Sequence, residues 1–193
     1  MEHGIRFFKQ SYLRLTGFCD ADWAGCINTR RSTSGYCIFL GANCISWSSK
    51  RQPIVFRSSA EAEYRSLASN AAEITWLTFL LCDIGIQLRE PPQLLCDNLS
   101  ALHMIVNHVF HARSKHIELD YHFVREKVAR GVLITRFLPS SLQVADIFTK
   151  ALPKTSFQFF RFKLGVHKFP LTSLRGADKG NSDKGNSNSA NCS

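Results

Sequence analysis

The chain has 193 residues, 45% of them hydrophobic, which suits one domain with a real core plus short extra segments. Lys and Arg outnumber Asp and Glu by 24 to 15, and the resulting charge of +9 fits either an ordinary basic surface or a polyanionic partner such as nucleic acid. Seven cysteines without a C-x-x-C pair argue against a disulfide framework, and no stretch resembles a signal-peptide core or a membrane span, so we expect a soluble, non-secreted protein of the cytoplasm or nucleus.

The first part of the chain is predicted to form three antiparallel strands joined by short turns. Residues 13–19 alternate between polar and apolar side chains, residues 35–40 are apolar and aromatic, and residues 44–47 resume the strand pattern. Asp20 is expected to close the first strand, and a basic turn at 28–34 leads into the second.

A long amphipathic helix is predicted to begin at Ser58. Apolar residues recur at steps of three and four from Leu67 to Ile84, and Ser58 with Glu61 fits the S-x-x-E capping box of a helix start. Glu61 therefore has a structural role, which leaves Glu63 to face elsewhere.

Strands and helices alternate in the next part of the chain. Residues 93–96 form a short apolar run that ends at Asp97, and Asn98 fits the N-cap of a helix through residue 107. Residues 117–128 are amphipathic, and residues 132–138 resemble a strand. Late strands that alternate with helices imply parallel pairing added to the antiparallel hairpins, which is a mixed α/β sheet.

The C-terminal part begins with a second candidate capping box, Ser140 with Gln143, which would place Asp146 in the second turn of a helix. A Phe-rich terminal helix is expected at 155–166, and beyond Gly176 a polar stretch with a tandem D-K-G-N-S repeat is expected to be disordered. We divide the chain into an upstream remnant, a main domain, a helical extension and a disordered tail: 1–12, 13–152, 153–170 and 171–193.

Four carboxylates stand beside different backbone signatures: Asp20, Glu63, Asp97 and Asp146. Isolated ionised carboxylates are costly to bury, so acids that point toward a core usually have a cation among them. Acids without an organised basic partner suit hard divalent ions such as Mg²⁺, which take oxygen ligands. This is the arrangement that a two-metal nuclease needs.

Residues 13–152 resemble the ribonuclease H domain at the end of Copia-type retrotransposon polyproteins, particularly those of plants. The matching motifs are Asp20-Ala-Asp-Trp-Ala-Gly25, Arg30-Arg-Ser-Thr-Ser-Gly-Tyr36, Ile45-Ser-Trp-Ser-Ser-Lys-Arg-Gln-Pro53, Ser59-Ala-Glu-Ala-Glu-Tyr64, Cys96-Asp-Asn98, Arg113-Ser-Lys-His-Ile117 and Ala145-Asp-Ile-Phe-Thr-Lys150. The resemblance implies a ribonuclease H-like five-stranded mixed sheet flanked by helices, and an endonuclease that cuts RNA paired to DNA during reverse transcription.

The resemblance also implies roles for the four acids. Asp20 is assigned as the bridging ligand of two Mg²⁺ ions, Glu63 and Asp97 as ligands of the first ion and Asp146 of the second, and Mn²⁺ is expected to substitute for Mg²⁺. Taken singly, Asp97 could instead be a turn former and Asp146 a favourable charge near a helix N-terminus.

Two sets of residues are candidates for substrate binding. Side chains beside the proposed ligands could reach RNA 2′-hydroxyls: Ser58, Ser59 and Asn98. Basic residues could hold phosphates without choosing a sequence: Arg30, Arg31, Lys50 and Arg51. For the basic residues, the alternative is a solvated basic turn.

Several histidines suggest a zinc-binding site. The spacing of these histidines argues against it, because the spacing fits none of the common zinc-site patterns. The five of the seven histidines that suggest it are His103, His108, His111, His116 and His122. A phosphate-facing or structural loop around His111 and Arg113 is the preferred interpretation. The loop before Asp146 contains no histidine, although many ribonucleases H carry one there. The three tryptophans are expected in the core.

Two rival functions remain open. The first is a catalytically inactive retroelement remnant that only binds nucleic acid, and the second is a DNA-cutting integrase or transposase of the same fold class. The resemblance places a reverse transcriptase domain before this one in the polyprotein. Because no Tyr-x-Asp-Asp polymerase motif is present, we expect an isolated piece of such a polyprotein.

Overall fold

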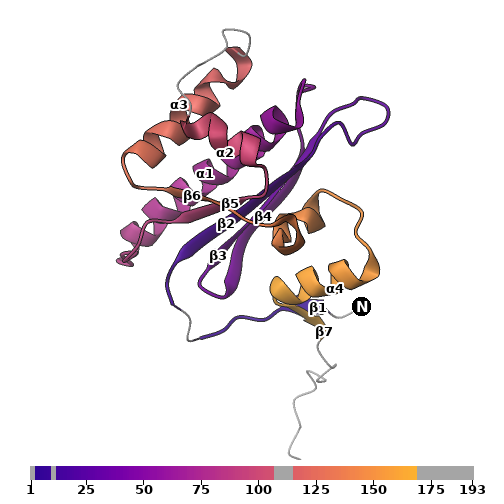
Figure 1. The fold of residues 1–193 in the computed structure, drawn as a ribbon. Helices are drawn as coiled ribbons and strands as arrows, with labels where there is room; N and C mark the ends of the chain where they lie inside the picture. The colour runs from indigo at the N-terminus through magenta and orange to yellow at the C-terminus, as the bar shows by residue number, and fades with distance from the viewer. Residues whose placement is uncertain (1–2, 10–11, 107–114, 169–193) are drawn as a thin grey trace, which may run out of the picture.

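The computed structural model describes residues 3–9, 12–106 and 115–168. Its centre is a five-stranded sheet in the order β4-β3-β2-β5-β6 (Figure 1). The strands are β2 (Leu15–Asp22), β3 (Thr33–Leu40), β4 (Asn43–Arg51), β5 (Gln93–Cys96) and β6 (Ile134–Phe137). The pairs β2–β3 and β3–β4 are antiparallel, whereas β2–β5 and β5–β6 are parallel. The predicted mixed sheet is therefore confirmed.

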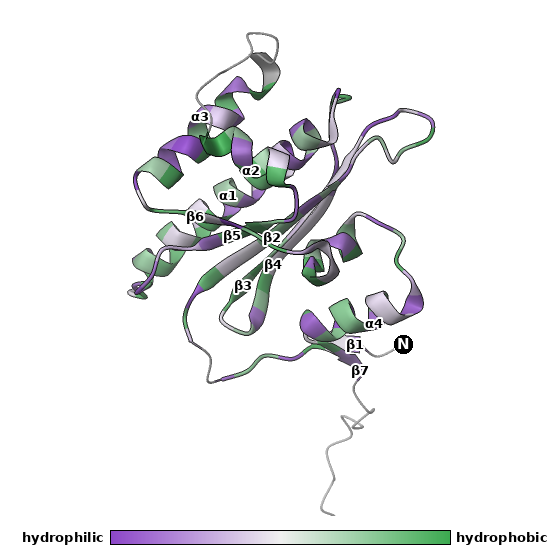
Figure 2. Ribbon diagram, in the orientation of Figure 1, coloured by the Kyte–Doolittle hydropathy of each residue, from purple (hydrophilic) through white to green (hydrophobic). Residues whose placement is uncertain are grey.

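One face of the sheet is covered by three helices, α1 (Ser59–Asp83), α2 (Leu99–Val106) and α3 (Lys115–Ala129) (Figure 1). The capping box at Ser58 and Glu61 is present, so α1 begins where the sequence predicted. Figure 2 shows hydrophobic, green segments on both α1 and the central strands. The main core lies there, and its fully buried members include Leu15, Ile38, Leu67, Ala71 and Leu94.

The opposite face carries two short 3₁₀ turns, η1 (Ser140–Leu142) and η2 (Val144–Phe148), followed by α4 (Lys154–Lys163). The α-helix predicted to begin at Ser140 is therefore wrong. The side chain of Gln143 is fully buried and donates to the Cys19 carbonyl at 2.9 Å, and the backbone of Gln143 is extended, which separates the two turns. A second core of Cys37, Phe39, Val144 and Phe160 fills this face.

The two ends of the described chain form a second, two-stranded sheet. β1 (His3–Ile5) pairs antiparallel with β7 (Val166–Lys168), and the Arg6 amide donates to the Gly165 carbonyl at 2.8 Å. The sequence did not indicate this pairing, which joins the segment before residue 13 to the C-terminal extension. The four-part division of the chain stays a prediction, and the tail at 171–193 lies outside the described residues.

Large aromatic side chains are more exposed than the sequence suggested. Trp23, Trp47 and Trp76 are 45%, 51% and 56% exposed, so their assignment to the core is wrong. Trp76 lies on the outer side of α1. Within the described residues, no helix is long and apolar enough to cross a membrane.

Candidate active site

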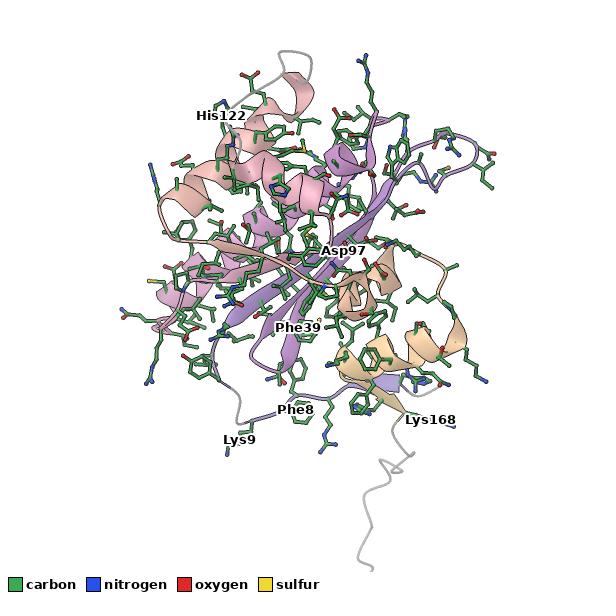
Figure 3. The ribbon with its side chains drawn as sticks, in the orientation of Figure 1. Phe8, Lys9, Phe39, Asp97, His122 and Lys168 are labelled. Carbon is green, nitrogen blue, oxygen red and sulfur yellow. The ribbon has the colours of Figure 1, made fainter. Side chains whose placement is uncertain are left out.

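The four predicted acids come from four different elements that meet at one end of the sheet. Asp20 lies inside β2 and is fully buried, so it does not close the strand as expected. Glu63 projects from the second turn of α1 and is 6% exposed. Asp97, labelled in Figure 3, directly follows β5, and Asp146 lies in η2.

The acids form two overlapping groups of potential metal ligands. Oxygens of Asp20, Asp97 and Asp146 lie within 4.8 Å of one another, and so do ligand atoms of Glu63, Cys96 and Asp97. Asp97 belongs to both groups, because it stands at the strand end between the two faces of the sheet. The sequence-based hypothesis instead assigned the role of the ligand shared by both metal ions to Asp20.

A basic side chain accompanies the acids, contrary to the assumption made from the sequence. The Lys150 ammonium donates to Oδ1 of Asp20 at 2.9 Å and to Oδ1 of Asp146 at 3.0 Å. The Thr149 hydroxyl donates to the other oxygen of Asp20. Lys150 stands four residues after Asp146 in the A-D-I-F-T-K motif, and this spacing was the available sequence signal for the second contact.

Close packing against Gly35 brings η2 to Asp20. Gly35 pairs with Asp20 across β2 and β3, and a Cβ atom on Gly35 would lie 2.7 Å from Cγ2 of Thr149 and 2.8 Å from Cβ of Phe148. On the other face of the same pair, the Ser66 hydroxyl of α1 lies 2.8 Å from the Asp20 carbonyl oxygen. The backbone at Asp20 is thus fixed from both faces.

The electrostatics of the site favour a further cation. Burial, the charge of Asp20 and the neighbours Cys96 and Asp97 raise the pKa of Glu63 to about 10. Burial and the charge of Asp20 also raise the pKa of Asp146 to about 6, although Lys150 partly offsets them. Burial lowers the pKa of Lys150, but the attraction of Asp20 and Asp146 outweighs it, so the net shift is upward.

The donor set suits a hard divalent ion. Oε2 of Glu63 is buried and has no hydrogen-bond partner among the described residues, and the other candidates, apart from the Cys96 sulfur, are carboxylate oxygens, which Mg²⁺ and Mn²⁺ prefer. Cys96 is a potential ligand that the sequence reasoning missed, although it directly precedes Asp97. Neither group includes a histidine among the described residues, and His108, His111 and Arg113 lie outside them.

Two of the predicted RNA-contacting residues have structural roles. The Ser58 hydroxyl accepts a hydrogen bond from the Glu61 amide at 3.3 Å as the N-cap of α1. Oδ1 of Asn98 accepts from the Ala101 amide at 3.0 Å, which confirms its predicted capping of α2. Ser59 is exposed at the start of α1. Contact of these three with RNA stays a prediction.

The four basic candidates are exposed and lie at the end of the sheet that carries the acids. Lys50 and Arg51 lie at the end of β4, where they pair with Ser34 and Thr33 of β3. Arg30 and Arg31 lie in the loop between β2 and β3. Lys50 and Arg51 also line a pocket of about 420 Å³ between β4 and α1. Its other lining residues are Ser34, Tyr36, Ser48, Gln52, Pro53, Arg65 and Ser69.

Solved ribonuclease H domains share this architecture. The N-terminal RNase H domain of a Mycobacterium tuberculosis protein matches 76% of this chain and 98% of its own with a TM-score of 0.52 and 13% identity. LC11-RNase H1, solved in complex with an RNA/DNA hybrid, matches 70% of this chain and 94% of its own with a TM-score of 0.52 and 14% identity. The chain has the ribonuclease H-like fold.

The sequence of the chain is similar to parts of plant retrotransposon polyproteins. The retrovirus-related Pol polyprotein from transposon RE2 of Arabidopsis thaliana is 48% identical over 169 residues, which are 88% of this chain and 12% of the polyprotein. The one from transposon TNT 1-94 of Nicotiana tabacum is 36% identical over 79% of this chain and 11% of the polyprotein. No protein-family model matches the chain. The chain is therefore similar, over most of its own length, to one part of the plant retrovirus-related Pol polyproteins, and it spans only 11–12% of the length of these two relatives.

Proposed function

We propose that the chain is a divalent-metal-dependent ribonuclease H of a Copia-type element, which hydrolyses the RNA strand of RNA–DNA hybrids during reverse transcription. The observation that carries the proposal is the meeting of Asp20, Glu63, Asp97 and Asp146 from four elements in two groups that share Asp97. The solved relative LC11-RNase H1 was found with an RNA/DNA hybrid, which supports the substrate class.

The residues of the site would have different roles. Asp20, Asp97 and Asp146 would hold one Mg²⁺ ion and Glu63 with Asp97 another, and Mn²⁺ would serve in the same places. When bound, such ions activate a water molecule and stabilise the departing oxygen of the phosphodiester. Lys150 keeps Asp20 and Asp146 in place by neutralising them, and it must release at least one of these oxygens to a metal ion.

The basic residues would bind the hybrid. Arg30, Arg31, Lys50 and Arg51 are exposed at the end of the sheet where the acids meet, so they can hold phosphates of a duplex laid across the site. Phosphate contacts supply affinity without sequence choice. In the polyprotein context, a reverse transcriptase domain would present the hybrid to this surface, and the work would take place inside the cell.

One observation favours the inactive, nucleic-acid-binding remnant. Lys150 already occupies oxygens of Asp20 and Asp146 that a metal ion would need, so a chain unable to release this lysine would bind hybrids without cutting them.

The deciding experiment incubates the purified chain with an end-labelled RNA–DNA hybrid and Mg²⁺ or Mn²⁺. The nuclease shortens the RNA strand, and Asp97→Asn abolishes this while the exposed Asp83→Asn does not. A mobility shift without shortening in either metal would establish the binding-only remnant. Cleavage of plain duplex DNA would instead favour the integrase or transposase class.

A further inference from the structure

The second ligand group differs from the first in its chemistry, because it includes a thiol. Cys96 is the last residue of β5 and is fully buried, and its Sγ lies within 4.8 Å of carboxylate oxygens of Glu63 and Asp97. The Asn98 amide donates to the same sulfur at 3.4 Å, so the thiol is held at the strand end beside the two acids.

Glu63 shows that this group can accept a cation. Its side chain is 6% exposed, and its Oε2 has no hydrogen-bond partner among the described residues. A buried carboxylate oxygen without a partner is costly, and a cation is the partner that compensates it most fully.

Lys150 makes the two groups unequal. It donates to Asp20 and Asp146, both of the first group, whereas neither salt bridge of this lysine involves Glu63 or Asp97. A metal ion entering the first group competes with an ammonium for Asp20 and Asp146, whereas no salt bridge within the described residues competes for Glu63.

We propose that Glu63, Cys96 and Asp97 form a binding site for a thiophilic divalent ion, Zn²⁺ or Cd²⁺. One sulfur and two carboxylate oxygens are ligands that zinc commonly takes, and three protein ligands leave a fourth position for water. In a tetrahedral zinc site, sulfur and oxygen donors lie about 3.5 Å apart, so these ligand atoms, which lie within 4.8 Å of one another, would move closer together on binding.

Binding replaces the Cys96 S–H bond and the Glu63 O–H bond by bonds to the metal ion and releases two protons to solvent, with no oxidation or reduction. Soft thiolate ligands select against Mg²⁺, and Zn²⁺ binds most mixed sites more tightly than the hard ions do. The ion would therefore occupy Asp97, which both groups share, and block the hard-metal site. The binding stands by itself, whereas the resulting inhibition of hydrolysis rests on the proposed function.

The test uses Cd²⁺ as the probe, because a cadmium–thiolate bond gives a charge-transfer absorption in the ultraviolet that carboxylates do not give. The full chain carries Cys26→Ser, Cys82→Ser and Cys192→Ser, so that these three thiols do not contribute to the signal. We expect one equivalent of Cd²⁺ to produce the band, and Cys96→Ala to weaken binding on the order of tenfold or more. The matched control is Cys37→Ala, because Cys37 is an equally buried thiol of β3 in the second core.

A second variant keeps the test decisive if Cys96→Ala does not fold. Asp97→Asn keeps the thiol and must still weaken the band, and thermal unfolding of each variant verifies the fold. An unchanged Cd²⁺ titration in either folded variant would overturn the site. In the cleavage assay with Mg²⁺, added Zn²⁺ should inhibit the chain that carries the three Cys→Ser substitutions. If Cd²⁺ gives the absorption band but the chain does not cleave the hybrid, the proposed nuclease function is refuted and the metal site is supported. If the chain cleaves the hybrid but Cd²⁺ gives no band, only the metal site is refuted.

Discussion

The Lys150 ammonium lies 2.9 Å from Oδ1 of Asp20, a carboxylate that is fully buried in the central strand and 130 residues away in the sequence. The same ammonium lies 3.0 Å from Oδ1 of Asp146. In the absence of a metal ion, this lysine is therefore the positive charge that stabilises two of the four acids, and it competes with metal ions for their oxygens.

Replacing this lysine should make the fold depend on metal. Lys150→Met leaves Asp20 buried without a cation, which we expect to cost about 1–3 kcal/mol, less than a fully buried pair because the lysine is partly exposed. Without its competitor, Mg²⁺ should bind more tightly. Thermal unfolding with and without Mg²⁺ measures both effects.

Lys154→Met is the matched control, since Lys154 is exposed at the start of α4 and forms no ion pair with the four acids in the described part of the chain. A Tm of Lys150→Met that equals the Tm of this control in chelator would show that the ion pair contributes nothing.

The stability of the metal-free protein should fall as the pH rises. The pKa of Glu63 is about 10 in the folded chain against an ordinary 4.5, so the folded state binds this proton more tightly than the unfolded state does. Its contribution is complete below the ordinary pKa and is lost progressively as the pH rises toward about 10. Asp146, with a pKa of about 6, adds the same trend over a lower range.

Glu63→Gln should remove most of this slope. A neutral amide requires no proton, so the variant should be more stable than the parent at about pH 8 in chelator, by at least about 1 kcal/mol or roughly 2–4 °C in Tm. Excess Mg²⁺ should reverse the order, because it stabilises the carboxylate and not the amide. Equal pH profiles of parent and variant in chelator would contradict the assigned protonation of Glu63.

The sequence was sufficient where short-range signals decide the structure. The strand Gln93–Cys96 lies between Pro92 and the polar pair that begins with Asp97, and the observed bounds are the predicted ones. The capping box at Ser58 likewise begins α1 as expected. Glu63 and Asp97 could be selected from the sequence because each stands beside a local backbone signal, the start of α1 and the end of β5.

Long-range partners decided the features that the sequence did not reveal. Gln143 fits a capping-box pattern, but its side chain binds the Cys19 carbonyl, 124 residues away, and this contact splits the expected helix into two turns. The pairing of β1 with β7 also joins opposite ends of the chain. No periodicity within either segment encodes its distant partner.

The close approach of η2 to the sheet should depend on the missing side chain of Gly35. In Gly35→Ala the new Cβ would lie 2.7 Å from Cγ2 of Thr149. This distance is too short for two carbon atoms, so η2 would have to move away from β3. We expect a loss of about 1–3 kcal/mol in the free energy of unfolding from overpacking, together with loss of hybrid cleavage because Asp146 and Lys150 move with η2. Denaturant unfolding and the cleavage assay measure the two effects.

Thr33→Ala serves as the control, since it lies at the start of the same strand and adds no volume. Full cleavage by Gly35→Ala would mean that the placement of η2 against β3 is not needed for the reaction.

Ser58 and Ser59 separate a structural role from substrate binding. The Ser58 hydroxyl caps α1, so Ser58→Ala should lower the free energy of unfolding by about 1 kcal/mol, whereas Ser59→Ala should change it by less than about 0.5 kcal/mol because Ser59 is exposed. If either hydroxyl also contacts the RNA, its loss should raise KM for the hybrid at a temperature where the variant is fully folded. An unchanged KM for Ser58→Ala would leave that residue as a cap alone, and an unchanged KM for both would remove them from the substrate-binding set, while the carboxylates that define the site would keep their assignment.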